Sequence, residues 1–333
     1  MTRFVTTIAA VIFFLTCTAL PLYAQWIPRH FNADVSFRVE CLFSNQTLSK
    51  YDDPVLRTQN YGNPSPPPGE ITIGFANPIE RLRIDYNNNL PVLDGMVELT
   101  PVPSVSARLR GCTSVLASDR TVTLSSGPVR VITANPNTPF IPDFFVGWRE
   151  LSASIKPQFW FWEAAGLYNL SYEGFYRYSL VGGFRQESWS YQPSNNDATN
   201  SYLRDDFTSQ IPFIGMQTVM NGPCWKARFE ALGSPFMTKK VAHTARDQVD
   251  YIQLDGSLTQ GGFIELQIDG NINVTPNGLM GVYAQYSYEQ LKGELTGTSK
   301  DGDRLRNDYL TTSYNFYTLK SIWTLGLSGS ILF

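Results

Sequence analysis

The residues of this chain that could do chemistry are charged side chains that recur at even spacing within short segments. The set carries both signs, so it could form ion pairs or provide a polar pathway or a binding site for a solute. An even spacing places side chains on one face of a β-strand. The chemistry therefore depends on strands that gather this set, which comprises Arg108, Arg110, Arg177, Arg185, Lys226, Arg228, Glu230, Glu265, Asp269 and Glu289.

Signals of catalysis or metal binding are weak. The two histidines are His30 and His243. The sequence contains no Gly-x-Ser-x-Gly elbow and no phosphate-binding loop, and its His and Cys spacing does not suit zinc. We therefore expect no enzymatic activity, no metal and no cofactor.

Two polar segments have simpler explanations than a site. The acidic stretch 300–308 lacks the regular ligand spacing of a calcium loop, which favours a solvated turn. His243 is flanked by Lys239, Lys240 and Arg246, so we expect it to be a solvated residue of an external loop.

The strands that would position the charges are easiest to recognise at the end of the sequence. Apolar and small or polar residues alternate there, as in a strand with one face in lipid and the other in a polar lumen, although a strand of a soluble β-sandwich is the alternative. The apolar face is Trp323, Leu325, Leu327, Gly329, Ile331 and Phe333, and the other face is Thr324, Gly326, Ser328 and Ser330.

The same alternation recurs upstream between turn signals, which predicts an all-β fold: a transmembrane up-and-down antiparallel β-barrel. Four short turns, at 100–104, 169–174, 220–223 and 275–278, imply eight strands. An opening strand near 35–41 and the final strand raise the number to ten, with eight or twelve as alternatives.

Two stretches do not fit this count. Segments 44–94 and 116–156 are assigned to long external loops with some strand content of their own.

The start of the sequence predicts export. Arg3 precedes an apolar run, and Ala24 followed by Gln25 suits signal-peptide cleavage, which divides the chain into a signal peptide, 1–24, and a barrel domain, 25–333. No later apolar run is long enough for a membrane helix, so insertion would use strands. Aromatic residues make up 14% of the chain, which suits membrane-interface girdles, and the formal charge of −3 gives no reason to expect nucleic acid.

A barrel of about ten strands has a lumen that side chains largely fill. Buried charges persist when they are paired, so we expect the set above to form ion pairs across the lumen. A polar pathway for a solute is the alternative. Cys41, Cys112 and Cys224 allow at most one disulfide within the mature chain.

Taken together, the tail, the turns and the signal segment resemble those of bacterial outer-membrane β-barrel proteins. The resemblance implies location in the outer membrane of a Gram-negative-type bacterium and contact with its lipid. It also implies that the barrel-assembly machinery recognises Phe333 during biogenesis.

Size and strand number are similar to those of the omptins, the ten-stranded outer-membrane proteases. Omptins use an Asp-x-Asp pair and an Asp-x-His pair. This chain has an Asp-x-Asp at Asp301 and Asp303 but no Asp-x-His. The resemblance therefore implies the fold without the protease activity.

The sequence as a whole favours a non-enzymatic outer-membrane surface protein, structural or adhesive, with a largely filled lumen and an unknown surface ligand. A small-solute channel and an omptin-like surface hydrolase are the alternatives.

Overall fold

The computed structural model describes residues 32–50, 72–73, 83–115, 119–126, 129–132, 145–146, 149–171, 175–194, 202–246, 251–300 and 310–332. Among these, no helix is long and apolar enough to cross a membrane. Several predicted features lie outside the described residues: the signal segment with Ala24 and Gln25, His30, Asp301, Asp303 and Phe333.

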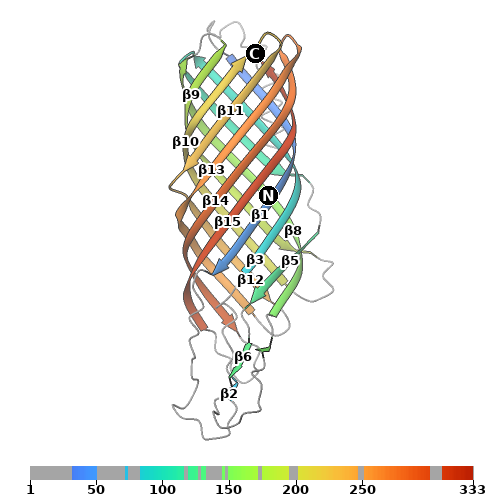
Figure 1. Cartoon of the computed structure of the whole chain (residues 1–333), viewed down its shortest axis with the longest axis vertical. Coiled ribbons are helices and arrows are strands. Elements are labelled where there is room, and N and C mark those ends of the chain that lie inside the picture. Colours follow the sequence, from blue (N-terminus) through green and yellow to red (C-terminus); the bar gives the residue numbers. More distant parts are fainter. Residues whose placement is uncertain are drawn as a thin grey trace.

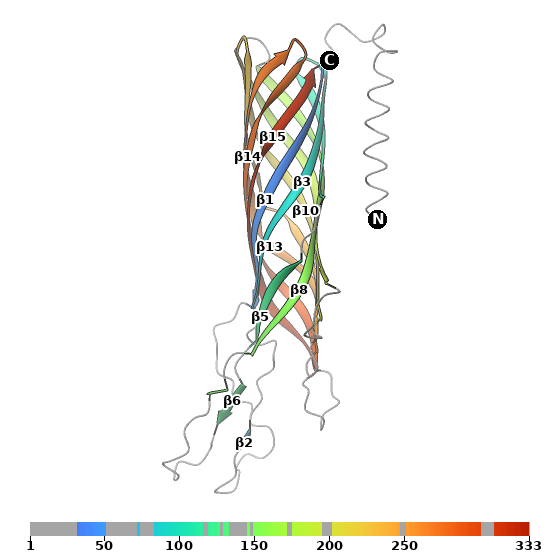
Figure 2. The same ribbon diagram turned by 90° about the vertical axis from the view of Figure 1, so that its right-hand side faces the viewer.

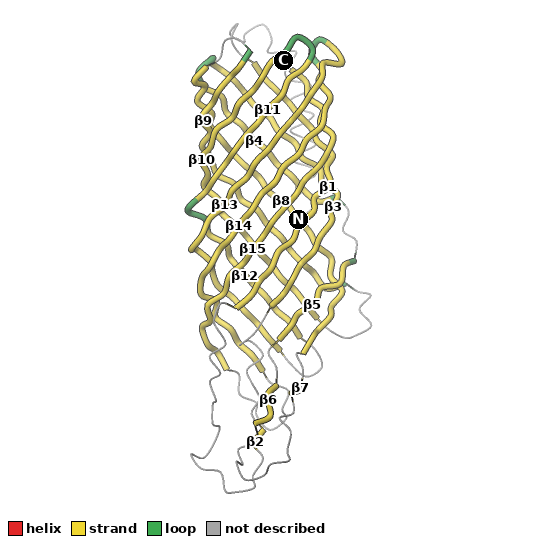
Figure 3. The backbone as a smooth tube through the Cα atoms, viewed as in Figure 1, coloured by secondary structure: helices red, strands yellow, loops and turns green. Residues whose placement is uncertain are grey.

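Twelve long or medium strands form one closed antiparallel sheet, a tall barrel (Figures 1 and 3). They are β1 (Asn32–Lys50), β3 (Arg83–Val102), β4 (Val105–Ser114), β5 (Arg120–Ser126), β8 (Arg149–Ser171), β9 (Tyr176–Pro193), β10 (Tyr202–Asn221), β11 (Trp225–Ser234), β12 (Thr238–Arg246), β13 (Tyr251–Thr275), β14 (Gly278–Lys300) and β15 (Leu310–Leu332). Pairing of β1 with both β15 and β3 closes the ring. Three short strands, β2 (Thr72–Ile73), β6 (Val129–Ile132) and β7 (Phe145–Val146), form a separate small sheet.

The twelve strands fill ten positions around the barrel, which we call staves. Two of these positions are each filled by two successive strands. Strands β4 and β5 both lie between β3 and β8, and β11 and β12 both lie between β10 and β13. The expected ten-membered antiparallel barrel is confirmed.

The connections differ between the two ends of the barrel. At one end, which we call the turn end, β3 meets β4, β10 meets β11, and β13 meets β14 through connections of two or three residues. These turns lie where the sequence predicted them, and the fourth predicted turn falls between β8 and β9. The turn end is uppermost in Figure 1, and the opposite end, the loop end, is lowermost (Figure 2).

The predicted loop boundaries were wrong. Strand β1 continues to Lys50 and β3 begins at Arg83, so both ends of the segment 44–94 belong to the barrel wall. Strands β5 and β8 likewise take residues 120–126 and 149–156 out of the second predicted loop, and they extend existing staves without adding new ones.

An apolar belt surrounds the half of the wall nearest the turn end. Along β14, outward side chains from Met280 to Tyr288 are apolar or aromatic, and along β15 the outward residues from Trp323 to Ile331 continue the belt, as expected. Such a band is the surface that a membrane barrel presents to lipid. Other exposed members are Val39, Phe43, Leu93, Leu109, Trp160, Trp162, Tyr168, Tyr176, Tyr178, Ile214, Met216, Trp225, Phe229, Ile264, Ile268 and Ile272.

Beyond the belt, the polarity of the two faces is exchanged. On β14, inward Glu289 is followed by inward Leu291 and Leu295, both fully buried, while outward positions become polar from Gln290 onward. The half of the barrel nearest the loop end therefore has a polar outer wall and an apolar core, like a water-soluble protein.

A β-bulge on β13 marks this change. The register with β14 shifts between Leu258 and Gln260, so Thr259 is an extra residue. Two residues after Thr259, Gly261 has φ of +146°, which disfavours a side chain, and a Cβ there would lie 1.9 Å from the carbonyl oxygen of Gln290.

Candidate functional site

Buried charges fill the lumen inside the apolar belt. Arg108 on β4 makes two hydrogen bonds to Glu230, at 2.5 and 2.9 Å, and a third, at 3.0 Å, to Glu163. Since β4 and β11 stand four staves apart in the ring, the Arg108–Glu230 pair crosses the lumen.

Ion pairs made by Arg185 cross the lumen beside the Arg108–Glu230 pair. Its guanidinium donates to Glu163 at 2.6 and 3.0 Å and to Glu265 at 2.6 and 2.7 Å. Bidentate arginine–carboxylate pairs are geometrically strict, so the two crossings, joined through Glu163, brace the wall from inside.

Nearer the turn end, two further ion pairs lie in the lumen. Lys226 lies 2.7 Å from Asp34, and Arg177 lies 3.0 Å from Glu98, while Arg228 approaches both carboxylates. A cavity of about 20 Å³ remains beside Asp34, room for about one water molecule.

Arg38 and Arg110 occupy the adjoining part of the lumen. Arg38 pairs with Asp269 at 2.8 Å, and Arg110 pairs with Asp94 at 2.7 Å. Both guanidiniums also lie against the ring of Tyr283, with centroid distances of 4.0 and 5.6 Å.

A third group of charges lies where the belt ends. Glu289 pairs with both Lys239 and Lys320, and Lys320 also reaches Glu187 on β9, five staves away on the opposite wall. Trp189 donates its indole N–H to the same Glu187 carboxylate at 2.8 Å.

The structure thus places all ten charged residues singled out in the sequence inside the barrel, and each makes an ion pair with another inward residue. We call these ten, together with Asp34, Arg38, Asp94, Glu98, Glu163, Glu187, Lys239 and Lys320, the lumen charge network.

His243 does not occupy an external loop, so that expectation was wrong. It is an inward residue of β12, 1% exposed, with Nδ1 2.5 Å from Asp205 on β10. The hydroxyl of Tyr86 donates to the other oxygen of Asp205 at 2.5 Å, across four staves. Burial, and next the Asp205 carboxylate, raise the pKa of Tyr86 well above that of an ordinary phenol, so the hydroxyl keeps its proton.

The Asp205–His243 pair resembles the base of a hydrolase, but it is enclosed. The ring of Tyr86 stacks on Tyr191 with a centroid distance of 4.3 Å, and Phe207 packs edge-on against both. Other apolar side chains complete a layer that we call the apolar plug, comprising Leu48, Ile84, Ile155, Leu203, Phe207, Val241, Leu254, Leu291, Leu295 and Phe316.

Sequence reasoning missed the inward residues near and beyond the belt edge for a physical reason. Lys320 shares parity with Thr324, so strand parity alone could have found it. Lys239 and His243 alternate with Lys240, Ala242 and Thr244, and no lipid-facing apolar row marks that segment. The rule of apolar outside and polar inside applies only within the apolar belt.

Cysteines contribute no cross-link among the described residues. Cys41 is exposed on the belt, Cys112 is buried in the lumen and Cys224 lies at the turn end, each as a free thiol.

Comparison with known proteins supports the architecture. No family model matches the chain, and no curated protein matches it. Among solved structures, the outer membrane protease OmpT from Escherichia coli is similar with a TM-score of 0.62 and 16% identity, covering 92% of this chain and 97% of that one.

A weaker similarity links the chain to another outer-membrane barrel. The translocator domain of the autotransporter NalP from Neisseria meningitidis gives a TM-score of 0.37 at 8% identity, covering 96% of each chain. At 16% identity, the likeness to the protease concerns the fold alone: the chain has the closed, antiparallel, ten-stave fold of an outer-membrane-type β-barrel.

Proposed function

We propose that the chain is a non-enzymatic integral protein of a Gram-negative-type outer membrane, structural or adhesive, with a barrel closed to solutes. In this proposal an N-terminal signal peptide directs export, the turn end faces the periplasm, and the loop end projects from the cell. The apolar belt supports insertion because it is the surface expected to meet lipid.

The observation that carries the proposal is that side chains occupy the lumen at two levels. Ion pairs such as Arg108–Glu230 and Arg185–Glu265 cross it within the belt, and the apolar plug fills it beyond the belt. A hydrated ion would have to break buried ion pairs and then enter an apolar layer, and each step is costly. We therefore assign the structural or adhesive activity to the outer surface of the loop end.

A surface hydrolase is the second candidate, and the Asp205–His243 contact of 2.5 Å is what favours it. The imidazole Nε2 has no hydrogen-bond partner among the described residues, which leaves it free to act as a general base. Against this candidate, His243 is 1% exposed, so a substrate reaches it only if the apolar plug opens.

One reconstitution separates the three functions. Protein is incorporated into vesicles, and its insertion is verified by flotation and by heat-dependent migration on gels. We expect no single-channel conductance in planar bilayers, and no cleavage of fluorogenic peptides by the vesicles. Steady conductance that changes when Arg108 and Arg110 become alanine would establish a channel instead. Peptide turnover that disappears in His243→Asn would establish a hydrolase.

A further inference from the structure

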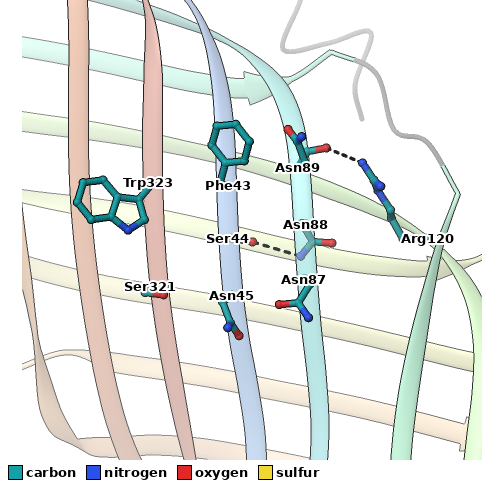
Figure 4. Close-up of a pocket in the computed structure, with 9 residues that line it drawn as sticks. All are labelled: Phe43, Ser44, Asn45, Asn87, Asn88, Asn89, Arg120, Ser321 and Trp323. Atoms are coloured by element: carbon teal, nitrogen blue, oxygen red, sulfur yellow. Dashed lines mark hydrogen bonds between the residues drawn. The ribbon is translucent and has the colours of Figure 1, made fainter.

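A groove on the outer wall lies apart from the lumen. It has a volume of about 300 Å³ and is formed by β1, β3 and β15 with the start of β5 (Figure 4). Its lining is Phe43, Ser44, Asn45, Asn87, Asn88, Asn89, Arg120, Ser321 and Trp323. The groove sits at the edge of the apolar belt, where the wall passes from lipid to water.

Strand register arranges the lining in two rows. Asn45 lies between Asn87 on β3 and Ser321 on β15, which makes a polar row across three strands. One step nearer the turn end, Phe43 lies between Asn89 and Trp323, which makes an aromatic row. The two rows are adjacent, so rings and amides face the same space.

These side chains are available to a ligand. Trp323 is 55% exposed and Phe43 is 42% exposed. Among the nine lining residues, two hydrogen bonds involve side chains: the Asn88 amide donates to Ser44 at 3.2 Å, and Arg120 donates to the Asn89 carbonyl oxygen at 3.2 Å (Figure 4). The amides of Asn45 and Asn87 take part in neither.

Arg120 adds a buried polar atom that needs a partner. Its Nε is shielded from solvent and forms no hydrogen bond among the described residues. A buried donor without an acceptor costs free energy, and a ligand oxygen reaches this atom only when the Arg120 side chain moves.

The residue types are unusual for their place. Asparagine is depleted in strands, yet Asn87, Asn88 and Asn89 follow one another within β3, and Asn45 faces them from β1. Asn88 is explained by its inward hydrogen bonds to Ser44 and Tyr191. Nothing within the wall requires amides at the outward positions 45 and 87.

We propose that this groove binds a saccharide. A pyranose ring has an apolar face of C–H groups and an edge of hydroxyls, each of which donates and accepts hydrogen bonds. The aromatic row suits the C–H face, while each amide offers a carbonyl acceptor and an NH₂ donor to the hydroxyls. The proposal does not depend on whether the lumen is closed.

The test uses full-length protein in detergent micelles and vesicles. One arm measures binding to an array of free neutral oligosaccharides, and another measures binding to vesicles that contain a neutral glycolipid. Binding in either arm is expected, and the arm that responds identifies a free or a membrane-anchored source. Loss of both amides in the Asn45→Ala, Asn87→Ala double variant is expected to weaken binding about ten-fold or more.

Two controls make the result specific. Asn315→Ala removes an exposed amide of β15 outside the groove and should bind as the wild type does. Trp323→Phe should retain more binding than Trp323→Ala, because it keeps an aromatic ring. Wild-type protein that binds in neither arm, or a double variant that binds as well as the wild type, would overturn the proposal. Binding that requires a phosphate group on the glycan would also overturn it.

Discussion

At the scale of single residues, ion pairs inside the barrel and ion pairs on its outer surface are expected to differ in how much they stabilise the fold. Arg185 is buried between Glu163 and Glu265, whereas Arg204 makes an exposed pair with Asp206 at 3.0 Å. Removing one partner of a buried network leaves the others uncompensated, while an exposed pair is screened by water. The lumen charge network is therefore expected to contribute specificity of folding that the surface pairs do not.

We predict that Arg185→Met lowers the free energy of unfolding by about 3–5 kcal/mol. The matched variant Arg204→Met should lower it by no more than about 1 kcal/mol. Urea unfolding in detergent micelles, followed by loss of heat-dependent gel migration, measures both. Equal unfolding midpoints for the two variants would show that the buried network does not stabilise the barrel.

At the scale of elements, the bulge on β13 lies where the outer face of this strand changes from apolar to polar. The extra residue Thr259 lies two positions before Gly261, whose backbone tolerates a side chain poorly. We predict that Gly261→Ala destabilises the barrel by about 1–3 kcal/mol.

The control is a glycine of β9. A Cβ at Gly182 would meet no atom within 4 Å, so Gly182→Ala should change stability by no more than about 0.5 kcal/mol. The urea midpoint and the yield of heat-modifiable protein report both variants. If Gly261→Ala behaves as Gly182→Ala does, the bulge is not a constraint on the fold.

The strands and turns also show how much of the fold could be predicted from the sequence. The turns at 100–104, 169–174, 220–223 and 275–278, together with the opening strand near 35–41 and the alternation of Trp323 to Ile331, predicted ten staves, because lipid imposes one strict pattern on the wall. The loop-end halves of β1, β3 and β8 were assigned to loops because that pattern ends at the belt. The contact between Asp205 and His243 could not be predicted, since it depends on the register of β10 with β12.

The whole molecule is taller than a bilayer requires. Strand β14 has 23 residues, and at about 3.3 Å per residue and a tilt of about 40° it rises roughly 55–60 Å along the barrel axis. An apolar belt of about 25 Å is typical of outer-membrane barrels. The remainder of the wall, with its polar outer face and the apolar plug inside, is expected to stand clear of lipid as a rigid extension.

Spin labels on the outer wall would measure this extension. In a chain whose native cysteines are replaced, labels at Leu266 and Leu325 should be accessible to oxygen and shielded from a water-soluble nickel chelate, because both residues lie on the belt. Labels at Lys240 and Asn315, exposed beyond the belt, should show the reverse. Oxygen-rich environments at all four positions would mean that lipid covers the full height of the wall, and the exchange of polarity along the strands would then need another cause.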